Sequence, residues 1–314
     1  MIAPLDRFQG CLLGLALGDA LGAPFEGGLP ERILWRLIGR TKRGEMRWTD
    51  DTQMSVDVLE SLLAKGTVNP DDLAVRFARS YRWSRGYGPA TAKLLRRIAR
   101  GAHWSDANRS VYPTGSFGNG AAMRAPVVGL FHADRSDDLP DATRQSAIVT
   151  HAHEQAIEGA VLVALATAGA ARQDASPAIL DRAESCCSLE PFRTRLARAR
   201  TWLESRSDVT TGDVVRELGH RVSARESCVT ALYLALRFRD QPFLDMQRFM
   251  AACGGDADTI GAMAGAIWGA ANGAIKLPRE PLDRLEQRER LAALAAALHE
   301  RCANRDGFAA ELNA

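Results

Sequence analysis

Two short acidic clusters, about 200 residues apart in the chain, have the clearest capacity for chemistry. The first is Trp48-Thr49-Asp50-Asp51-Thr52, and the second is Gly254-Gly255-Asp256-Ala257-Asp258-Thr259. Each places two carboxylates and a threonine hydroxyl at the start of a predicted helix. Threonine and aspartate are favoured at helix N-termini, so one cluster alone fits a helix cap equally well. Paired carboxylates within ~4–6 Å of each other, however, repel unless a cation neutralises them.

Hard divalent cations are the natural partners of such clusters. Mg²⁺ and Mn²⁺ bind through carboxylate, hydroxyl and water oxygens, whereas the chain has no histidine-rich group that would favour zinc. The oxygen ligands that the two clusters could supply jointly are Thr49, Asp50, Asp51, Asp256, Asp258 and Thr259. Two ions ~3.5–4 Å apart can lower the pKa of a shared water and orient a diol. The sequence therefore predicts a dinuclear site and hydrolysis rather than redox chemistry.

A glycine-rich segment, Gly115-Ser116-Phe117-Gly118-Asn119-Gly120, is predicted to be a loop that opens a helix. Exposed amides at a helix start suit phosphate or diphosphate. The segment is not a Walker A motif, because no Gly-Lys-Ser/Thr follows, and not a Rossmann fingerprint, because no strand precedes it. The pattern alone fits an ordinary loop equally well.

The elements that must position these residues are predicted to be helices. Apolar residues recur at three- and four-residue spacing, and no long alternating stretch indicates a strand. Asn69-Pro70-Asp71-Asp72 and Ser176-Pro177 have the residue order of helix starts. We expect one all-α domain over residues 1–314, a compact orthogonal bundle. Its helices are expected near 5–22, 51–65, 70–82, 89–100, 153–171, 177–187, 190–204, 225–237, 243–252, 259–274 and 288–303. Residues 101–120 are expected to form a long functional loop without secondary structure.

Two of these helices carry a glycine at every fourth position: Gly10, Gly14, Gly18 and Gly22 in one, and Gly261, Gly265, Gly269 and Gly273 in the other. A glycine costs a helix interior about 1 kcal/mol relative to alanine, so four in register need a compensating cause. Close packing of two backbones is that cause. We therefore expect the two helices to cross each other, or a shared neighbour, near the centre of the molecule.

Composition restricts the class of protein. The 314 residues are 46% hydrophobic and 25% charged, which suits a large folded core, and the formal net charge of +2 gives no basic stripe for nucleic acid. The six cysteines have no Cys-x-x-Cys spacing, which favours reduced, mostly buried thiols. The sequence indicates neither a signal peptide nor a membrane span. We expect a cytoplasmic monomer that acts on a compact substrate.

Six motifs in order resemble the ADP-ribosylglycohydrolase family, whose namesake is the dinitrogenase reductase-activating glycohydrolase. They are Gly10-Cys11-Leu12-Leu13-Gly14 with Gly18-Asp19-Ala20-Leu21-Gly22, Thr49-Asp50-Asp51-Thr52, Gly86-Tyr87-Gly88, Gly118-Asn119-Gly120 with Met123-Arg124, Thr150-His151, and Gly255-Asp256-Ala257-Asp258-Thr259-Ile260-Gly261. The resemblance implies an all-α fold with two Mg²⁺ or Mn²⁺ ions, held by the six ligands named above. It also implies that Glu26 gates or assists this site.

The same resemblance implies a substrate site. Ser116, Phe117, Gly118, Asn119 and Gly120 would hold the diphosphate, with Phe117 stacking on adenine and His151 contacting ribose or phosphate. Tyr87 would line the cleft near the distal ribose. Taken without the family, Phe117 fits a core residue, Tyr87 a packing residue, and His151 a satisfied polar group.

The resulting hypothesis is hydrolysis of an ADP-ribosyl N- or O-glycosidic bond. A metal-held water would attack the anomeric carbon of the distal ribose, with Glu26, Asp50 or Asp51 moving protons. Arginine in a modified protein is our first choice of acceptor; serine-linked ADP-ribose, O-acetyl-ADP-ribose and modified nucleic acid stay open. A non-catalytic ADP-ribose-binding relative is the second hypothesis. A prenyl diphosphate synthase is the third, although its Asp-Asp-x-x-Asp is absent, because Asp50-Asp51 is followed by Thr52-Gln53-Met54.

Overall fold

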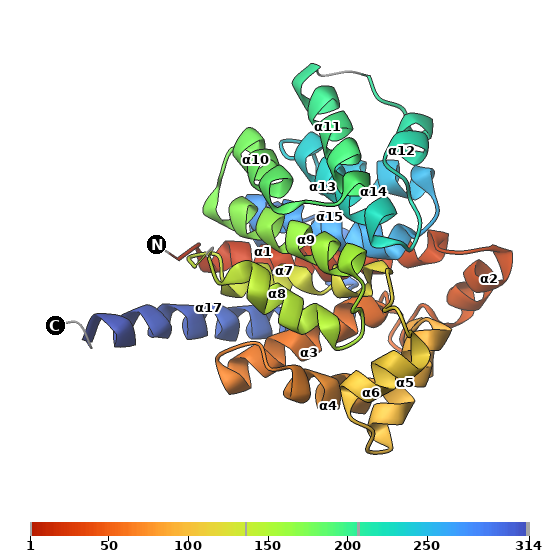
Figure 1. Ribbon diagram of the computed structural model, residues 1–314. Helices are drawn as coiled ribbons and strands as arrows, with labels where there is room; N and C mark the ends of the chain where they lie inside the picture. Colours follow the sequence, from red (N-terminus) through yellow and green to blue (C-terminus); the bar gives the residue numbers. More distant parts are fainter. Residues whose placement is uncertain (1, 136, 206–207, 312–314) are drawn as a thin grey trace.

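The two glycine-ridged helices lie against each other at the centre of the molecule, as Figure 1 shows for α1 (Leu5–Gly22) and α15 (Ala257–Asn272). A Cβ atom added to Gly14 would overlap the carbonyl of Gly265, and one on Gly22 would overlap that of Ala257. The pairing is antiparallel, so the end of α1 meets the start of α15. The expected crossing is confirmed, and it places Glu26, just beyond α1, beside the second acidic cluster.

The computed structural model describes residues 2–135, 137–205 and 208–311. Within these ranges the backbone forms helices and isolated β-bridges but no strand, so the all-α prediction is confirmed. The further elements are η1 (Ala23–Phe25), α2 (Leu29–Ile38), α3 (Asp50–Lys65), α4 (Pro70–Ser80), η2 (Trp83–Arg85), α5 (Pro89–Ala99), α6 (Trp104–Val111), η3 (Asn119–Ala121), α7 (Ala125–Phe131), α8 (Leu139–Ile148), α9 (Glu154–Arg172), α10 (Ser176–Cys186), α11 (Glu190–Ser205), α12 (Thr211–Glu217), α13 (Ala224–Arg237), α14 (Phe243–Cys253), η4 (Ala274–Lys276), α16 (Arg279–Asp283) and α17 (Arg288–Glu311).

The remaining helices form a shell around the central pair. Helices α9 and α13 pack on α15, α7 packs on α9, and α17 packs on α1 and α3. Helices α10 to α14 lie on one side of this core and α3 to α6 on the other (Figure 1). Helix α9 is buried along almost its whole length, from Ala156 to Ala171. This accounts for its apolar, alanine-rich sequence, because a helix enclosed by neighbours needs no polar face.

The expected loop over residues 101–120 is wrong in its first half, where α6 forms from Trp104 to Val111. Its cap is His103, whose Nδ1 accepts from the amide of Ser105, and Trp104 donates from Nε1 to Asp71 at 2.7 Å. Histidine is an unusual N-cap, and this tertiary bond to α4 is not visible in local sequence. Helices α2, α7, α8, α12 and α16 also lie outside the expected set, and all five are short, with ten residues or fewer.

One segment, Leu5–Phe25, is long and apolar enough to cross a membrane by length and composition. It is 78% buried, and its glycines pack against α15, so its apolar character has a cause inside the fold. All six cysteines are free thiols, and all except Cys186 are buried. The prediction of unpaired, mostly buried thiols therefore agrees with the structure.

Candidate active site

The first acidic cluster opens α3. Thr49 is the N-cap, and its hydroxyl accepts from the amide of Asp51 at 3.3 Å. Asp19, fully buried on α1, holds this turn from below: its carboxylate accepts from the amides of Thr49 and Thr52 and from the hydroxyl of Thr52 at 2.5 Å. Because Asp19 satisfies these donors, Asp50 and Asp51 are released from capping.

The second cluster opens α15 after two glycines with positive φ, Gly254 and Gly255. Asp256 occupies the N-cap position but its side chain makes no cap hydrogen bond. Its carboxylate instead accepts from Nδ2 of Asn119, and the Asp258 carboxylate accepts from the amide of Thr259 at 2.8 Å. Asp256 therefore does not serve as a helix cap, and its carboxylate is directed toward Asn119 instead.

The two clusters meet. The Thr259 hydroxyl lies 3.4 Å from Oδ1 of Asp51, which joins the starts of α3 and α15. Glu26, half-buried after η1, places a carboxylate oxygen within 4.8 Å of oxygens of Asp256 and Asp258. Three elements from distant parts of the chain thus bring acidic groups together, as the sequence predicted.

This concentration of negative charge is unfavourable by itself. Burial, followed by Glu26 and Asp19, raises the pKa of Asp50 well above its ordinary range. Burial, followed by Glu26 and Asp51, does the same to Asp258. Burial and neighbouring like charges both penalise the ionised form. Asp50 is the more exposed of these carboxylates, so water reaches it and moderates the effect.

The donor set fits divalent cations. Oδ2 of Asp51 is buried and has no hydrogen-bond partner, although such an atom is costly to leave unsatisfied. A cation placed between the clusters would satisfy it and would neutralise the neighbouring carboxylates. The candidate ligands are all oxygen donors, as hard cations require.

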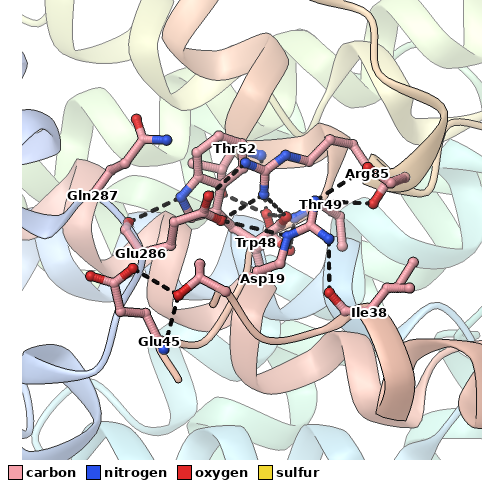
Figure 2. Close-up of polar contacts among 12 residues, drawn as sticks. Asp19, Ile38, Glu45, Trp48, Thr49, Thr52, Arg85, Glu286 and Gln287 are labelled. Atoms are coloured by element: carbon pink, nitrogen blue, oxygen red, sulfur yellow. Dashed lines mark hydrogen bonds and ion pairs between the residues drawn. The ribbon is translucent and has the colours of Figure 1, made fainter. Parts of the chain in front are cut away.

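A clamp fixes the segment that leads into the first cluster (Figure 2). Arg85 lies 3.5 Å over the Trp48 ring, donates to the Trp48 carbonyl at 2.7 Å, and makes two bonds to the Glu286 carboxylate at 2.7 and 2.9 Å. Trp48 in turn donates from Nε1 to the Glu286 carbonyl at 3.1 Å. Residues on either side of α3 and just before α17 therefore set where Thr49 lies.

The glycine-rich loop differs from its prediction in one respect. It does not open an α-helix directly: Asn119–Ala121 forms a 3₁₀ turn, and α7 begins only at Ala125. The amide of Asn119 is engaged by the Val222 carbonyl at 2.9 Å, and that of Gly118 by the Ser116 hydroxyl at 3.3 Å. A row of exposed helix-start amides is therefore absent from this described segment, and Asn119 instead orients Asp256.

The other predicted substrate residues lie in different environments. Phe117 is 55% exposed and makes a T-shaped contact with His153, so its ring is available for stacking. His151 is buried against Gly118 and Gly120. Tyr87 is 8% exposed and packs on Tyr81, with its hydroxyl unpaired. The ring of Tyr87 is thus a packing element beside the cluster.

The residues that support the candidate ligands were not predicted from the sequence. Asp19, Arg85, Arg124 and Glu286 hold the cluster or the loop but received no role. Asp19 had a detectable signal, since a carboxylate in the middle of an apolar glycine-ridged helix needs a buried partner. Glu286 had none, because an acid before a surface helix is an ordinary occurrence.

Comparisons with known proteins find similarity to one family over almost the whole chain. The family model described as ADP-ribosylglycohydrolase matches residues 1–307. ADP-ribosylhydrolase ARH3 of Xenopus tropicalis is 34% identical, over 88% of this chain and 90% of that protein. ADP-ribosylarginine hydrolase Tri1 of Serratia proteamaculans is 28% identical, over 94% and 79%. A solved structure titled ADP-ribosylglycohydrolase-related protein complex is 29% identical, with a TM-score of 0.72 over 95% of this chain and 98% of that one.

Proposed function

The chain belongs to the ADP-ribosylglycohydrolase family, and we propose that it is a divalent-cation-dependent hydrolase that releases ADP-ribose from a modified protein side chain. Hydrolysis of ADP-ribosyl glycosidic bonds follows from the family. The cation requirement and the acceptor are our proposals. The observation that carries the cation requirement is the convergence of acidic groups from α3, α15 and the end of α1 around an unsatisfied Oδ2 of Asp51.

The residues that would hold two Mg²⁺ or Mn²⁺ ions are Thr49, Asp50, Asp51, Asp256, Asp258 and Thr259. Such ions supply Lewis acidity, orient a ribose diol and lower the pKa of a water. Four carboxylates balance the charge of two divalent cations. The protein supplies order around them: Asp19 and Asn119 fix a member of each cluster through hydrogen bonds.

Proton transfer falls to the carboxylates that solvent reaches. Glu26 is half-buried beside Asp256 and Asp258, and Asp50 is partly exposed. A group at this border can take a proton from the attacking water or give one to the leaving side chain. Charge developing at the anomeric carbon is stabilised by the surrounding carboxylates, as in other glycoside hydrolyses.

Arginine stays our first choice of acceptor, because the Serratia relative that aligns with 94% of this chain is named for ADP-ribosylarginine. The ARH3 relatives have names that specify no acceptor, and serine-linked ADP-ribose stays our second candidate. The two linkages differ in leaving group, a guanidinium nitrogen against an alkoxide oxygen, and this difference is directly measurable.

The deciding experiment incubates the protein with matched arginine- and serine-linked ADP-ribosyl peptides, in Mg²⁺, in Mn²⁺ and in chelator. We expect release of ADP-ribose from the arginine peptide in either metal and none in chelator. Faster release from the serine peptide would transfer the proposal to that acceptor. Release that persists in chelator would reject the cation requirement, and binding of ADP-ribose without release from either peptide would make the protein a reader.

A further inference from the structure

A buried cation lies beneath the glycine-rich loop. Arg124 is fully buried, and in the described part of the chain it forms no ion pair. Its Nη1 donates to the Gly120 carbonyl, while Nη2 donates to the Ser146 carbonyl at 2.8 Å and to the Thr150 hydroxyl at 3.0 Å. Burial lowers the pKa of Arg124 to about 9, so the guanidinium is still charged at neutral pH. The charge of Asp57 acts on Arg124 from beyond ion-pair distance and partly opposes the effect of burial. A buried charge without an ion pair is costly, and the fold retains this one at the base of the loop.

The hydrogen bonds of Thr150 can be assigned from donor chemistry. A guanidinium only donates, so the Thr150 oxygen accepts from Arg124. Its other partner among the described residues is Nδ1 of His151, at 2.7 Å. The hydroxyl has one proton, and if it donates this proton to Nδ1, both of its hydrogen bonds are satisfied. If Nδ1 donated instead, the hydroxyl proton would have no acceptor and would lie beside the Arg124 cation. Nδ1 is therefore the acceptor.

The tautomer of His151 follows. Burial, followed by the charge of Arg124, lowers the pKa of His151 to about 3, so the ring is neutral. A neutral imidazole that accepts at Nδ1 carries its proton on Nε2. That atom faces the loop: a Cβ on Gly120 would lie 2.9 Å from Nε2, and one on Gly118 3.4 Å from it. Gly120 needs to be glycine because the imidazole edge occupies its side-chain space, whereas a Cβ on Gly118 would meet the ring at van der Waals distance.

The loop thus presents a donor above a buried positive charge. Nε2 of His151 makes no hydrogen bond of its own in the described chain, and neither do the amides of Phe117 and Gly120. We propose that Arg124 and Thr150 are positioning residues that hold His151 as the Nε2–H tautomer, so that Nε2 donates to an anionic oxygen of the substrate's diphosphate. The choice of diphosphate rests on the proposed function; the tautomer does not.

The test measures the tautomer of His151 and the binding of ligands in separate experiments. Long-range ¹H–¹⁵N spectra of the ¹⁵N-histidine-labelled, ligand-free protein report which ring nitrogen carries the proton, with His151→Asn to assign the signal. We expect Nε2–H in the wild type and in Thr150→Ser, which keeps the hydroxyl, and a shift of the His151 signals toward the Nδ1–H form in Thr150→Val. Thr167→Val is the matched control, because Thr167 is also a buried threonine whose hydroxyl bonds inside its own helix, to the Val163 carbonyl.

Calorimetry in chelator then compares ADP-ribose, ADP and adenosine. We expect Thr150→Val to weaken the binding of ADP-ribose and of ADP by about tenfold, the loss of one hydrogen bond to a charged group, and to leave the binding of adenosine unchanged. Thr150→Ser and Thr167→Val should bind all three ligands as the wild type does. An Nδ1–H signal in the wild type would overturn the proposed positioning of His151 by Arg124 and Thr150. So would an equal loss of adenosine affinity in Thr150→Val. Failure of the wild type to bind ADP-ribose would instead reject the proposed function, while the tautomer measurement still stands.

Discussion

The carbonyl oxygen of Gly265 occupies the space that a side chain on Gly14 would need. This contact repeats along α1 and α15, and it fixes the two helices antiparallel at backbone distance. Because α1 ends where α15 begins, the pairing delivers Glu26 to Asp256 and Asp258. The glycine spacing therefore determines both the core and the position of the acidic groups.

Replacing Gly14 with alanine is expected to destabilise the protein. The added methyl overlaps the Gly265 carbonyl, and overpacking costs roughly 1–3 kcal/mol, which outweighs the ~1 kcal/mol that alanine gains in helix propensity. Gly212→Ala is the control, since Gly212 lies exposed in α12 with its nearest contact at 3.7 Å. Chemical denaturation should show a lower free energy of unfolding for Gly14→Ala and a higher one for Gly212→Ala. Equal effects would mean that the helices do not pack at backbone distance.

Asp258→Asn is expected to raise thermal stability in chelator and to abolish the further stabilisation by Mn²⁺. The metal-free cluster is destabilised by burial and by Glu26 and Asp51, and one carboxylate fewer relieves this. Asp57→Asn is the control: Asp57 is also buried, but it bonds to Ser80 and Gln53. Thermal melts with and without Mn²⁺ should show the metal response lost in Asp258→Asn and kept in Asp57→Asn. A full Mn²⁺ response in Asp258→Asn would exclude this residue from the ligands.

The metal-free protein is expected to lose stability as pH rises from about 4 to 6. Burial raises the pKa of Asp19 and of Asp256 to about 6, from an ordinary value of 3.8. The folded state therefore binds more protons than the unfolded state in this window, and protonation favours folding. Saturating Mg²⁺ should flatten or reverse the slope, because cations bind the ionised groups. Melting curves over this range, in chelator and in Mg²⁺, test the sign of the slope. A slope unchanged by Mg²⁺ would argue against a cation at Asp256.

Glu286→Ala is expected to destabilise the protein by up to about 3–5 kcal/mol, the effect of removing one partner from a buried ion pair, because the side chains of Arg85 and Glu286 are only 9% and 12% exposed. Arg85 would lose both bonds to the carboxylate and would keep only the Trp48 carbonyl. Mn²⁺ affinity should fall too, since Trp48 precedes Thr49. Glu280→Ala removes an exposed pair with Arg284 and should change stability by less than ~1 kcal/mol. Urea denaturation measures both changes. Similar losses of unfolding free energy in the two variants would show that the Arg85–Glu286 pair does not stabilise this segment.

The sequence alone allowed prediction of the features that repeat or cluster. The glycine series, the Asn69 cap of α4 and the two acidic motifs have local patterns, and their positions at packed helices or helix starts are confirmed. Ser176, expected to cap α10, is instead its first helical residue, and Ala175 occupies the cap position. Helix α6 was missed because its histidine cap and its bond to Asp71 depend on tertiary structure. The glycine-rich loop was taken to open a helix because its sequence does not show that Val222 binds the Asn119 amide. The supports from Asp19 and Glu286 join segments 30 or more residues apart, beyond the reach of a local pattern.

The most direct test of the central claim is an anomalous diffraction map from crystals grown with Mn²⁺. We predict two Mn²⁺ peaks between the starts of α3 and α15, one within coordinating distance of Asp51 and one of Asp258, at the ~2–2.5 Å typical of oxygen ligands to such ions. A map with no Mn²⁺ peak in contact with either carboxylate would contradict the account.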